Sequence, residues 1–229
     1  MSEWKNGWST ASNKFLYSQL LVTSQQGKVA GKHQVASEQA IVKNDYQQEQ
    51  EKDVKKMVQE AKSIGAKGRN SLNAAVQAQD STVVSMQNNN SGMMSFSQSY
   101  DWNGKVTGTG YPPAIPSKGS LSFTHNGPPN DGSQGAVVYT GTSANGNACG
   151  WLLAWIAPTN ITATTPNRVY IECGSVNNYT TIDWSAIKAK LDVAPSSNYT
   201  MDPITRSSIS AEITGNGGYA ALGATFGSM

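Results

Sequence analysis

The sequence carries little charge and no concentration of either sign. Charged residues make up 14% of the 229 positions, and the formal net charge is +2 at pH 7. A nucleic-acid-binding domain typically shows a basic patch or stripe, and the sequence contains none. We therefore expect no nucleic acid partner, and no partner selected mainly by long-range electrostatic attraction.

Residue types that hold metals or act as nucleophiles are scarce and scattered. The chain has two histidines, His33 and His125, and two cysteines, Cys149 and Cys173. A zinc site needs closely paired ligands, whereas these four residues lie far apart in the sequence. No G-x-S-x-G motif occurs, although His125, Asp131 and a serine remain open as a triad assembled in space. The prediction is a protein that is not an enzyme, with no triad geometry, no catalytic residues, no metal and no cofactor.

The two cysteines allow two interpretations. Cys149 and Cys173 lie in strand-like segments that can pair as a hairpin, so a cross-strand disulfide is geometrically possible. Two reduced thiols fit a cytoplasmic protein better, because disulfides persist mainly in oxidising compartments.

Long hydrophobic runs are absent from the sequence. The longest apolar stretch, residues 151–157, is far too short to cross a bilayer as a helix. Residues 1–9 contain Trp4 and Trp8 but no apolar core of a signal peptide. The expected location is the cytoplasm, or release without a classical signal peptide.

The first third of the chain is expected to be helical. Residues 1–34 place aromatic residues at helical spacing, which fits either an interfacial amphipathic helix or a helix docked on its own domain. Residues 35–68 form a helical segment packed on the sheet domain, with the helix itself at 37–64 and a stop signal at Gly65 and Gly68. The stripe expected to face the core is Val54, Met57, Val58, Ala61 and Ile64.

The residue pattern of 69–229 is typical of a β-domain. Short runs of β-forming residues alternate with Gly, Pro and Asn turn signals, which indicates an antiparallel sandwich or barrel. One short helix is expected near 183–191, with Asp183 as its cap and Trp184, Ile187 and Leu191 on its buried side. The expected strands are 71–79, 83–86, 93–99, 120–125, 136–140, 149–157, 168–173, 209–213 and 219–226.

Aromatic residues are the most informative feature of this domain. Trp151 and Trp155 share one face of a strand and are expected to fill the core. Other aromatic residues fall in segments that look like loops, where a flat apolar ring with one polar atom suits a lipid interface or a sugar. The candidate ligand-binding residues are Trp102, Tyr111, Tyr179 and Tyr199.

Several segments of the second half resemble a known family. The residues that carry the resemblance are 135–141 (GAVVYTG), 147–155 (NACGWLLAW), 167–172 (NRVYIE) and 184–191 (WSAIKAKL). They are similar to the plant 23 kDa jasmonate-induced proteins and, more distantly, to the fungal protein nakanori. The resemblance covers about residues 35–214 and implies a mainly β, actinoporin-like sandwich. The resemblance to the plant proteins implies a stress-response protein. The resemblance to nakanori implies binding of sphingomyelin–cholesterol membranes without catalysis. Neither resemblance transfers a binding residue to this chain.

These observations favour a non-enzymatic protein that binds membrane lipid head groups in a stress or defence role. A stronger version is a pore former that inserts residues 1–22 and forms a homo-oligomer on the membrane. The alternatives are a lectin-like module that binds glycans through the same aromatic residues, and a structural protein that self-assembles through its charge-poor β surface. Loop aromatic residues gathered at one end of the sandwich favour the membrane, whereas a shallow groove with one stacking ring and convergent Asn or Asp side chains favours a sugar.

Overall fold

The structure is a computed structural model that describes residues 42–68, 80–216 and 218–229. The chain divides into two compact units, Met1–Tyr46 and Gln47–Met229. Both β-sheets belong to the second unit. The predicted helix within residues 1–34 and the predicted strand at 71–79 lie outside the described residues.

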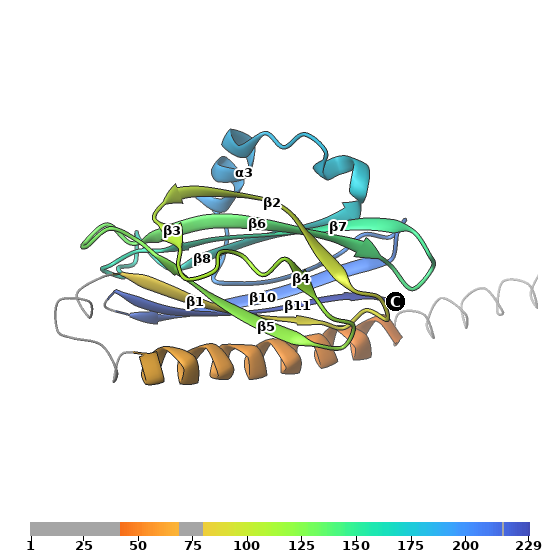
Figure 1. Ribbon diagram of the computed structural model, residues 1–229, viewed down its shortest axis with the longest axis horizontal. Coiled ribbons are helices and arrows are strands. Elements are labelled where there is room, and N and C mark those ends of the chain that lie inside the picture. The colour runs from red at the N-terminus through yellow and green to blue at the C-terminus, as the bar shows by residue number, and fades with distance from the viewer. Residues whose placement is uncertain (1–41, 69–79, 217) are drawn as a thin grey trace, which may run out of the picture. The chain divides into compact units, whose positions relative to one another are not determined.

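Two sheets form the centre of the second unit, as predicted for a β-sandwich (Figure 1). The six-stranded sheet has the order β3-β5-β1-β11-β10-β9, and the five-stranded sheet has the order β4-β2-β6-β7-β8. The strands of the first sheet are β1 (Ser81–Asn88), β3 (Lys105–Val106), β5 (Ser120–Asn126), β9 (Ser197–Met201), β10 (Ser207–Asn216) and β11 (Tyr219–Ser228). Those of the second are β2 (Met94–Asn103), β4 (Ala114–Ile115), β6 (Ser133–Thr142), β7 (Ala148–Ala157) and β8 (Arg168–Ser175).

Strand pairing departs from the prediction at one place in the first sheet. β1 and β11 pair in parallel, with Val84 opposite Leu222, although a purely antiparallel arrangement was expected. These strands come from opposite ends of the domain, so no hairpin turn connects them and either direction is sterically possible. The other neighbouring strands of both sheets pair antiparallel.

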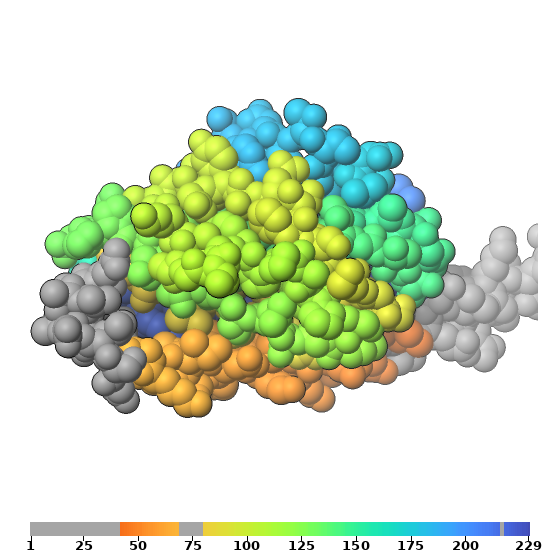
Figure 2. Space-filling model, viewed as in Figure 1, coloured from red at the N-terminus to blue at the C-terminus, as the bar shows by residue number. Residues whose placement is uncertain are grey.

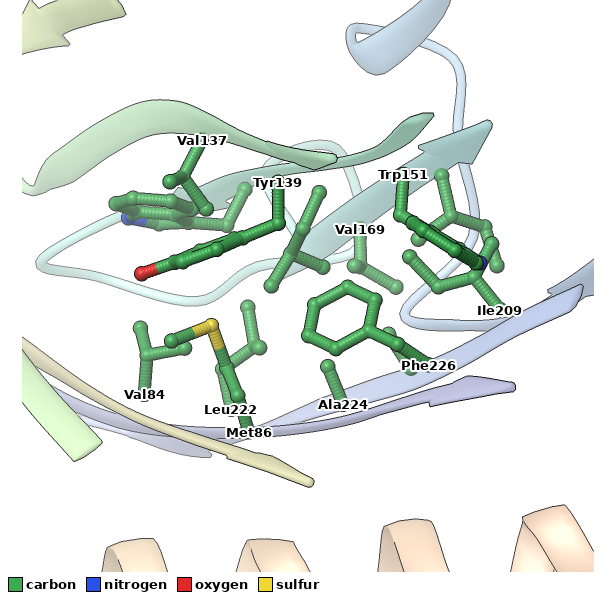
Figure 3. Close-up of a cluster of buried hydrophobic side chains, with 14 of the residues drawn as sticks. Val84, Met86, Val137, Tyr139, Trp151, Val169, Ile209, Leu222, Ala224 and Phe226 are labelled. Atoms are coloured by element: carbon green, nitrogen blue, oxygen red, sulfur yellow. The ribbon is translucent and has the colours of Figure 1, made fainter. Parts of the chain in front are cut away.

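The main core fills the space between the two sheets. Trp151, Trp155 and Val169 have no exposed surface and Ile171 has 3%, which confirms their predicted burial. Side chains from the five-stranded sheet, such as Tyr139, point toward Leu222 and neighbouring residues of the six-stranded sheet (Figure 3). This alternation of inward and outward side chains follows from the two-residue period of a strand.

A helix covers the outer face of the six-stranded sheet. Residues 42–68 are helical, and Val54, Val58 and Ala61 pack against the sheet as predicted (Figure 1). The helix backbone approaches β11 so closely that a Cβ on Gly223 would lie 2.5 Å from the Val58 nitrogen.

The prediction was wrong at the end of this helix. Ile64 is 37% exposed, and the helix continues past the expected stop at Gly65. Gly65 is buried under the ring of Tyr219, whose hydroxyl donates to the Ala61 carbonyl at 2.8 Å. Glycine therefore serves here as the contact point for an aromatic ring and not as a helix terminator.

A second helical layer covers the five-stranded sheet. It consists of the 3-10 helix η1 (Val176–Tyr179) and the α-helix α3 (Trp184–Leu191). Ile187 and Leu191 pack on Val138 and Leu152 of the sheet, as expected for the buried side of this helix. In the space-filling view α3 and the residues around it stand above β2 (Figure 2). Neither this helix nor residues 42–68 is long and apolar enough to cross a membrane.

Candidate aromatic binding surface

A β-bulge turns part of strand β2 toward the outer face of its sheet. Phe96 pairs with Tyr139, but the register then shifts so that Gln98 pairs with Val138 and Tyr100 with Ala136. Tyr139 lies in the core between the sheets, whereas Val138 and Ala136 lie under the helical layer. Directly opposed residues share a face of the sheet, so the extra residue at position 97 moves Tyr100 to the outside.

Trp102 lies at the second register shift of the same strand. Asp101 pairs with Gly135 and Asn103 with Gln134, which leaves Trp102 without an opposite residue. Its ring packs at the edge of the cluster formed by the sheet and α3. Because Trp102 follows Tyr100 by two residues, both aromatic side chains reach the outer face as a result of the bulge at position 97.

The first turn of α3 supplies a third ring. The Asp183 side chain caps the helix by accepting bonds from the backbone nitrogens of Ser185 and Ala186, each at 3.0 Å. Trp184 follows directly and is half-buried against the sheet. The cap fixes where the helix begins, and so fixes the position of this indole above β2.

Tyr100, Trp102 and Trp184 form one contiguous group, here called the aromatic cluster. Ring centroids of Tyr100 and Trp184 are 5.4 Å apart with planes at 24°, and those of Tyr100 and Trp102 are 5.3 Å apart. Trp102 meets Trp184 edge-on at 6.3 Å. Tyr100 is 42% exposed and the two indoles are half-buried, so the cluster presents aromatic surface to solvent.

Polar side chains next to the aromatic cluster are bonded within the fold. Gln98 donates to the Tyr179 carbonyl, and Asn103 donates to the carbonyls of Asp131 and Gly132 at 2.8 and 3.0 Å. Asp183 is engaged as the helix cap. The surface therefore offers ring faces and edges, with its nearest amide donors already used.

The four predicted binding residues do not come together. Trp102 lies in the aromatic cluster, but Tyr111 lies in the turn before β4 and packs at the edge of the core between the sheets. Tyr199 lies on strand β9, opposite Ser210, and is half-buried. Of the four residues, only Trp102 belongs to the aromatic cluster.

Tyr179 was expected to be an exposed loop residue, and this expectation is wrong. It is 4% exposed and its ring covers Gly150, where a Cβ would lie 2.2 Å from the ring. Burial raises the pKa of its hydroxyl far above the usual value. The ring anchors η1 on the sheet, so Tyr179 supports the helical layer that carries Trp184.

Tyr111 is held by rings and by a carboxylate. It stacks on Phe96 with centroids 5.7 Å apart and meets Phe123 edge-on at 5.0 Å. Its hydroxyl donates to Asp101 at 2.6 Å. Burial and the adjacent carboxylate raise the pKa of this hydroxyl far above its ordinary value, so it remains a donor.

His125 takes part in a serine–histidine–aspartate chain that the sequence analysis did not expect. Its Nδ1 lies 2.9 Å from the Ser133 hydroxyl, and its Nε2 lies 3.3 Å from the Asp101 carboxylate. The acid is Asp101 and not Asp131, which had been the candidate. The prediction that no such connectivity exists was therefore wrong.

The hydrogen-bonded group of Ser133, His125 and Asp101 is a structural network and not a nucleophilic centre. His125 and Ser133 have no exposed surface, and the Ser133 hydroxyl also accepts a bond from the Trp155 indole at 3.1 Å. An attacking serine needs a free path to a substrate carbonyl, which a fully buried hydroxyl lacks. Burial lowers the pKa of His125 although Asp101 opposes this effect, so the imidazole is neutral near pH 7.

The cysteines are free thiols on neighbouring strands. Cys149 pairs with Ser175 and Cys173 pairs with Trp151, so the two cysteines are two residues out of register. Such diagonal neighbours have Cα atoms about 7–8 Å apart, beyond the usual reach of a disulfide. In the ranges that the structure describes, no three His, Cys, Asp or Glu side chains lie together as a metal site.

A surface hollow near the β2–β3 turn lacks the features of a sugar site. Its volume is about 560 Å³, and no aromatic ring belongs to its described lining. The lining residues are Gly104, Lys105, Thr107, Asn126, Gly127 and Pro128.

Comparison with known proteins places this sandwich in a family. The chain belongs to the Nakanori-like protein family, whose sequence model matches residues 21–220. It is 49% identical over 180 residues to a jasmonate-induced protein homolog from Atriplex canescens, a match that covers 79% of this chain and 93% of that protein. The resemblance inferred from the segments around Trp151 and Trp155 is thereby confirmed.

A solved structure shows the same fold. The crystal structure of the lipid-binding protein Nakanori matches with a TM-score of 0.56 at 14% identity, over 72% of this chain and 80% of that one. A Xerocomus chrysenteron lectin matches with a TM-score of 0.40 at 12% identity, over 65% of this chain and 97% of the lectin.

Proposed function

We propose that this protein is a non-enzymatic binding protein that docks on membrane lipids through the aromatic cluster. The observation that carries the proposal is the contact of Tyr100, Trp102 and Trp184 on the outer face of the five-stranded sheet. Trp and Tyr rings favour the boundary between head groups and acyl chains, because the ring is apolar and its N–H or O–H stays hydrated.

The low net charge of the chain supports docking through apolar contacts. With a formal net charge of +2, attraction to anionic lipid contributes little, so affinity must come from apolar area. A ring that buries about 100 Å² contributes roughly 2–3 kcal/mol, and two or three rings together offset the cost of association.

One comparison supports a lipid ligand, because a solved structure with the same fold is that of a lipid-binding protein. The relative from Atriplex canescens is named as jasmonate-induced, which supports a role in stress or defence. We infer that the lipid surface is of the sphingomyelin–cholesterol type. A sugar site needs convergent polar groups, whereas Gln98, Asn103 and Asp183 beside the cluster are bonded within the fold.

Self-assembly through strand addition is disfavoured at one edge of each sheet. There the edge strands β3 and β4 are two residues long, and short edges disfavour pairing with another chain. The strands at the other two edges, β9 and β8, have five and eight residues. On the opposite side of the sandwich, the Cys173 thiol donates to the Ser207 carbonyl at 3.2 Å and so links the two sheets.

The test is flotation of the full chain with vesicles of different composition, alongside a glycan array. The vesicles are phosphatidylcholine alone, phosphatidylcholine with phosphatidylserine, and phosphatidylcholine with sphingomyelin and cholesterol. We expect the strongest binding to the sphingomyelin–cholesterol vesicles and no glycan signal. Saturable glycan binding without vesicle binding would support the lectin alternative, and sedimentation of the protein alone would support self-assembly.

A further inference from the structure

Asp101 connects the aromatic cluster to the interior of the sandwich. It lies between Tyr100 and Trp102 on β2, but it pairs with Gly135 on the core face of the sheet. Its carboxylate accepts the Tyr111 hydroxyl at 2.6 Å and faces His125 Nε2 at 3.3 Å. Two neighbouring rings thus point outward while the residue between them is bonded inward.

The partners of Asp101 are themselves fixed. Since a carboxylate only accepts, His125 Nε2 carries the proton and Nδ1 accepts from the Ser133 hydroxyl at 2.9 Å. The Trp155 indole donates to that hydroxyl at 3.1 Å and packs edge-on against the imidazole. Each donor in this hydrogen-bond network has an acceptor, and His125, Ser133 and Trp155 are fully buried, so the inner part of the network is rigid and holds Asp101 at its exposed end.

Strand β2 needs such an anchor because its backbone pairing with neighbouring strands is weak at residues 98–103. Among the described strands, β4 pairs with β2 only at Met94 and Ser95, so residues 98–103 are held by β6 alone. Register shifts interrupt that pairing on both sides of Asp101. An edge segment with broken pairing leaves side-chain contacts to fix its position.

We propose that Asp101 is a positioning residue that holds Tyr100 and Trp102 in contact with Trp184, through its bonds to His125 and Tyr111. The proposal rests on the proposed function of the aromatic cluster, and it adds the interior network as the support of that surface. The proposal gives Asp101 no ligand contact of its own, because its carboxylate lies on the opposite face of β2 from the rings of Tyr100 and Trp102.

The test compares Asp101→Ala with Asp101→Asn. The alanine variant removes both bonds, whereas the asparagine variant keeps an acceptor oxygen of the same reach. The control is Asp202→Ala, because Asp202 is likewise a carboxylate that accepts two bonds, in its case from the backbone nitrogen and hydroxyl of Thr205. The readouts are flotation with phosphatidylcholine–sphingomyelin–cholesterol vesicles, near-ultraviolet circular dichroism of the coupled Trp102–Trp184 pair, and the thermal midpoint.

We expect Asp101→Ala to weaken vesicle binding at least tenfold and to abolish the dichroism that Trp102→Phe also abolishes. Asp101→Asn should retain most of both signals, and Asp202→Ala should lose neither. If Asp101→Ala does not fold, Tyr111→Phe removes one of the two anchors and should still reduce the dichroism.

Unchanged dichroism in the folded Asp101→Ala variant, or in Tyr111→Phe if the alanine variant does not fold, would overturn the positioning role. Vesicle binding within about twofold of wild type, while Trp102→Ala loses binding, would overturn it as well. If Trp102→Ala binds vesicles normally, the proposed function fails, and the dichroism alone decides the role of Asp101.

Discussion

Trp184 in the first turn of α3 stacks on Tyr100 of β2, with ring centroids 5.4 Å apart. The two residues are far apart in the sequence, and a local structural feature brings each of them to this contact. A bulge brings Tyr100 outward, and the Asp183 cap starts the helix at Trp184. The candidate binding surface therefore depends on how the helical layer sits on the sheet.

Gly150→Ala should destabilise the protein by about 1–3 kcal/mol, because the new methyl group would overlap the Tyr179 ring. Displacement of Tyr179 should also shift η1 and α3, and so weaken vesicle binding. Urea denaturation and flotation measure the two effects. Gly92→Ala is the matched control, because a Cβ there meets nothing within 4 Å; equal stability of the two variants would contradict the packing described here.

Gly223→Ala should loosen the helix formed by residues 47–68. Its Cβ would lie 2.5 Å from the Val58 nitrogen and 2.6 Å from the Val54 carbonyl oxygen, and backbone atoms cannot rotate away. We expect a loss of about 1–3 kcal/mol in unfolding free energy and faster amide exchange in this helix. Exchange as slow as in wild type would show that the helix packs differently.

His125 should make stability depend on pH. Burial lowers its pKa below the usual 6.5, so the unfolded state binds more protons than the folded state as pH falls through that value. Stability should therefore be complete above pH 6.5 and decrease below it. Urea midpoints at pH 7.5 and 5.5 should differ more for wild type than for His125→Gln, and an equal difference in both proteins would rule out this contribution.

The cysteines should stay reduced and unreactive. They are out of register for a disulfide, and burial raises the pKa of the Cys173 thiol to about 11. Urea midpoints with and without dithiothreitol should agree, and iodoacetamide at pH 8 should label the native protein slowly. Rapid labelling, or a midpoint that falls on reduction, would contradict this arrangement.

Much of the fold was predictable because its signals are local. A nearly continuous apolar run marked β7, the alternation of Val169 and Ile171 marked β8, and the Asp183 cap with Ile187 and Leu191 marked α3. Strand β9 was missed because its sequence, SNYTM, is polar and half-buried along its length. The parallel pairing of β1 with β11 was missed because no local signal specifies the direction of a pairing between distant strands.

The candidate site was less predictable, because it depends on contacts between distant residues. The bulge at position 97 contains no Gly or Pro, so strict alternation places Phe96 and Tyr100 on the same face. Tyr179 resembled a loop residue, and only its packing on Gly150 makes it buried. Trp184 was assigned to the buried side of its helix, although it is only half-buried and completes the aromatic cluster.

The most direct test of the central claim is vesicle co-sedimentation of wild type and of the Trp102→Ala/Trp184→Ala double variant, at low and at high salt. The control is Ile204→Ala, because Ile204 is 82% exposed in the turn between β9 and β10 and lies outside the cluster. We predict wild-type binding to sphingomyelin–cholesterol vesicles that changes less than about twofold with salt, as expected without a polybasic anchor. The double variant should bind at least tenfold more weakly while remaining folded by far-ultraviolet circular dichroism, although the loss of two half-buried indoles should lower its thermal midpoint. Ile204→Ala should bind as wild type does. A wild-type protein that remains in the supernatant with every vesicle, or a double variant that sediments like wild type, would contradict the account.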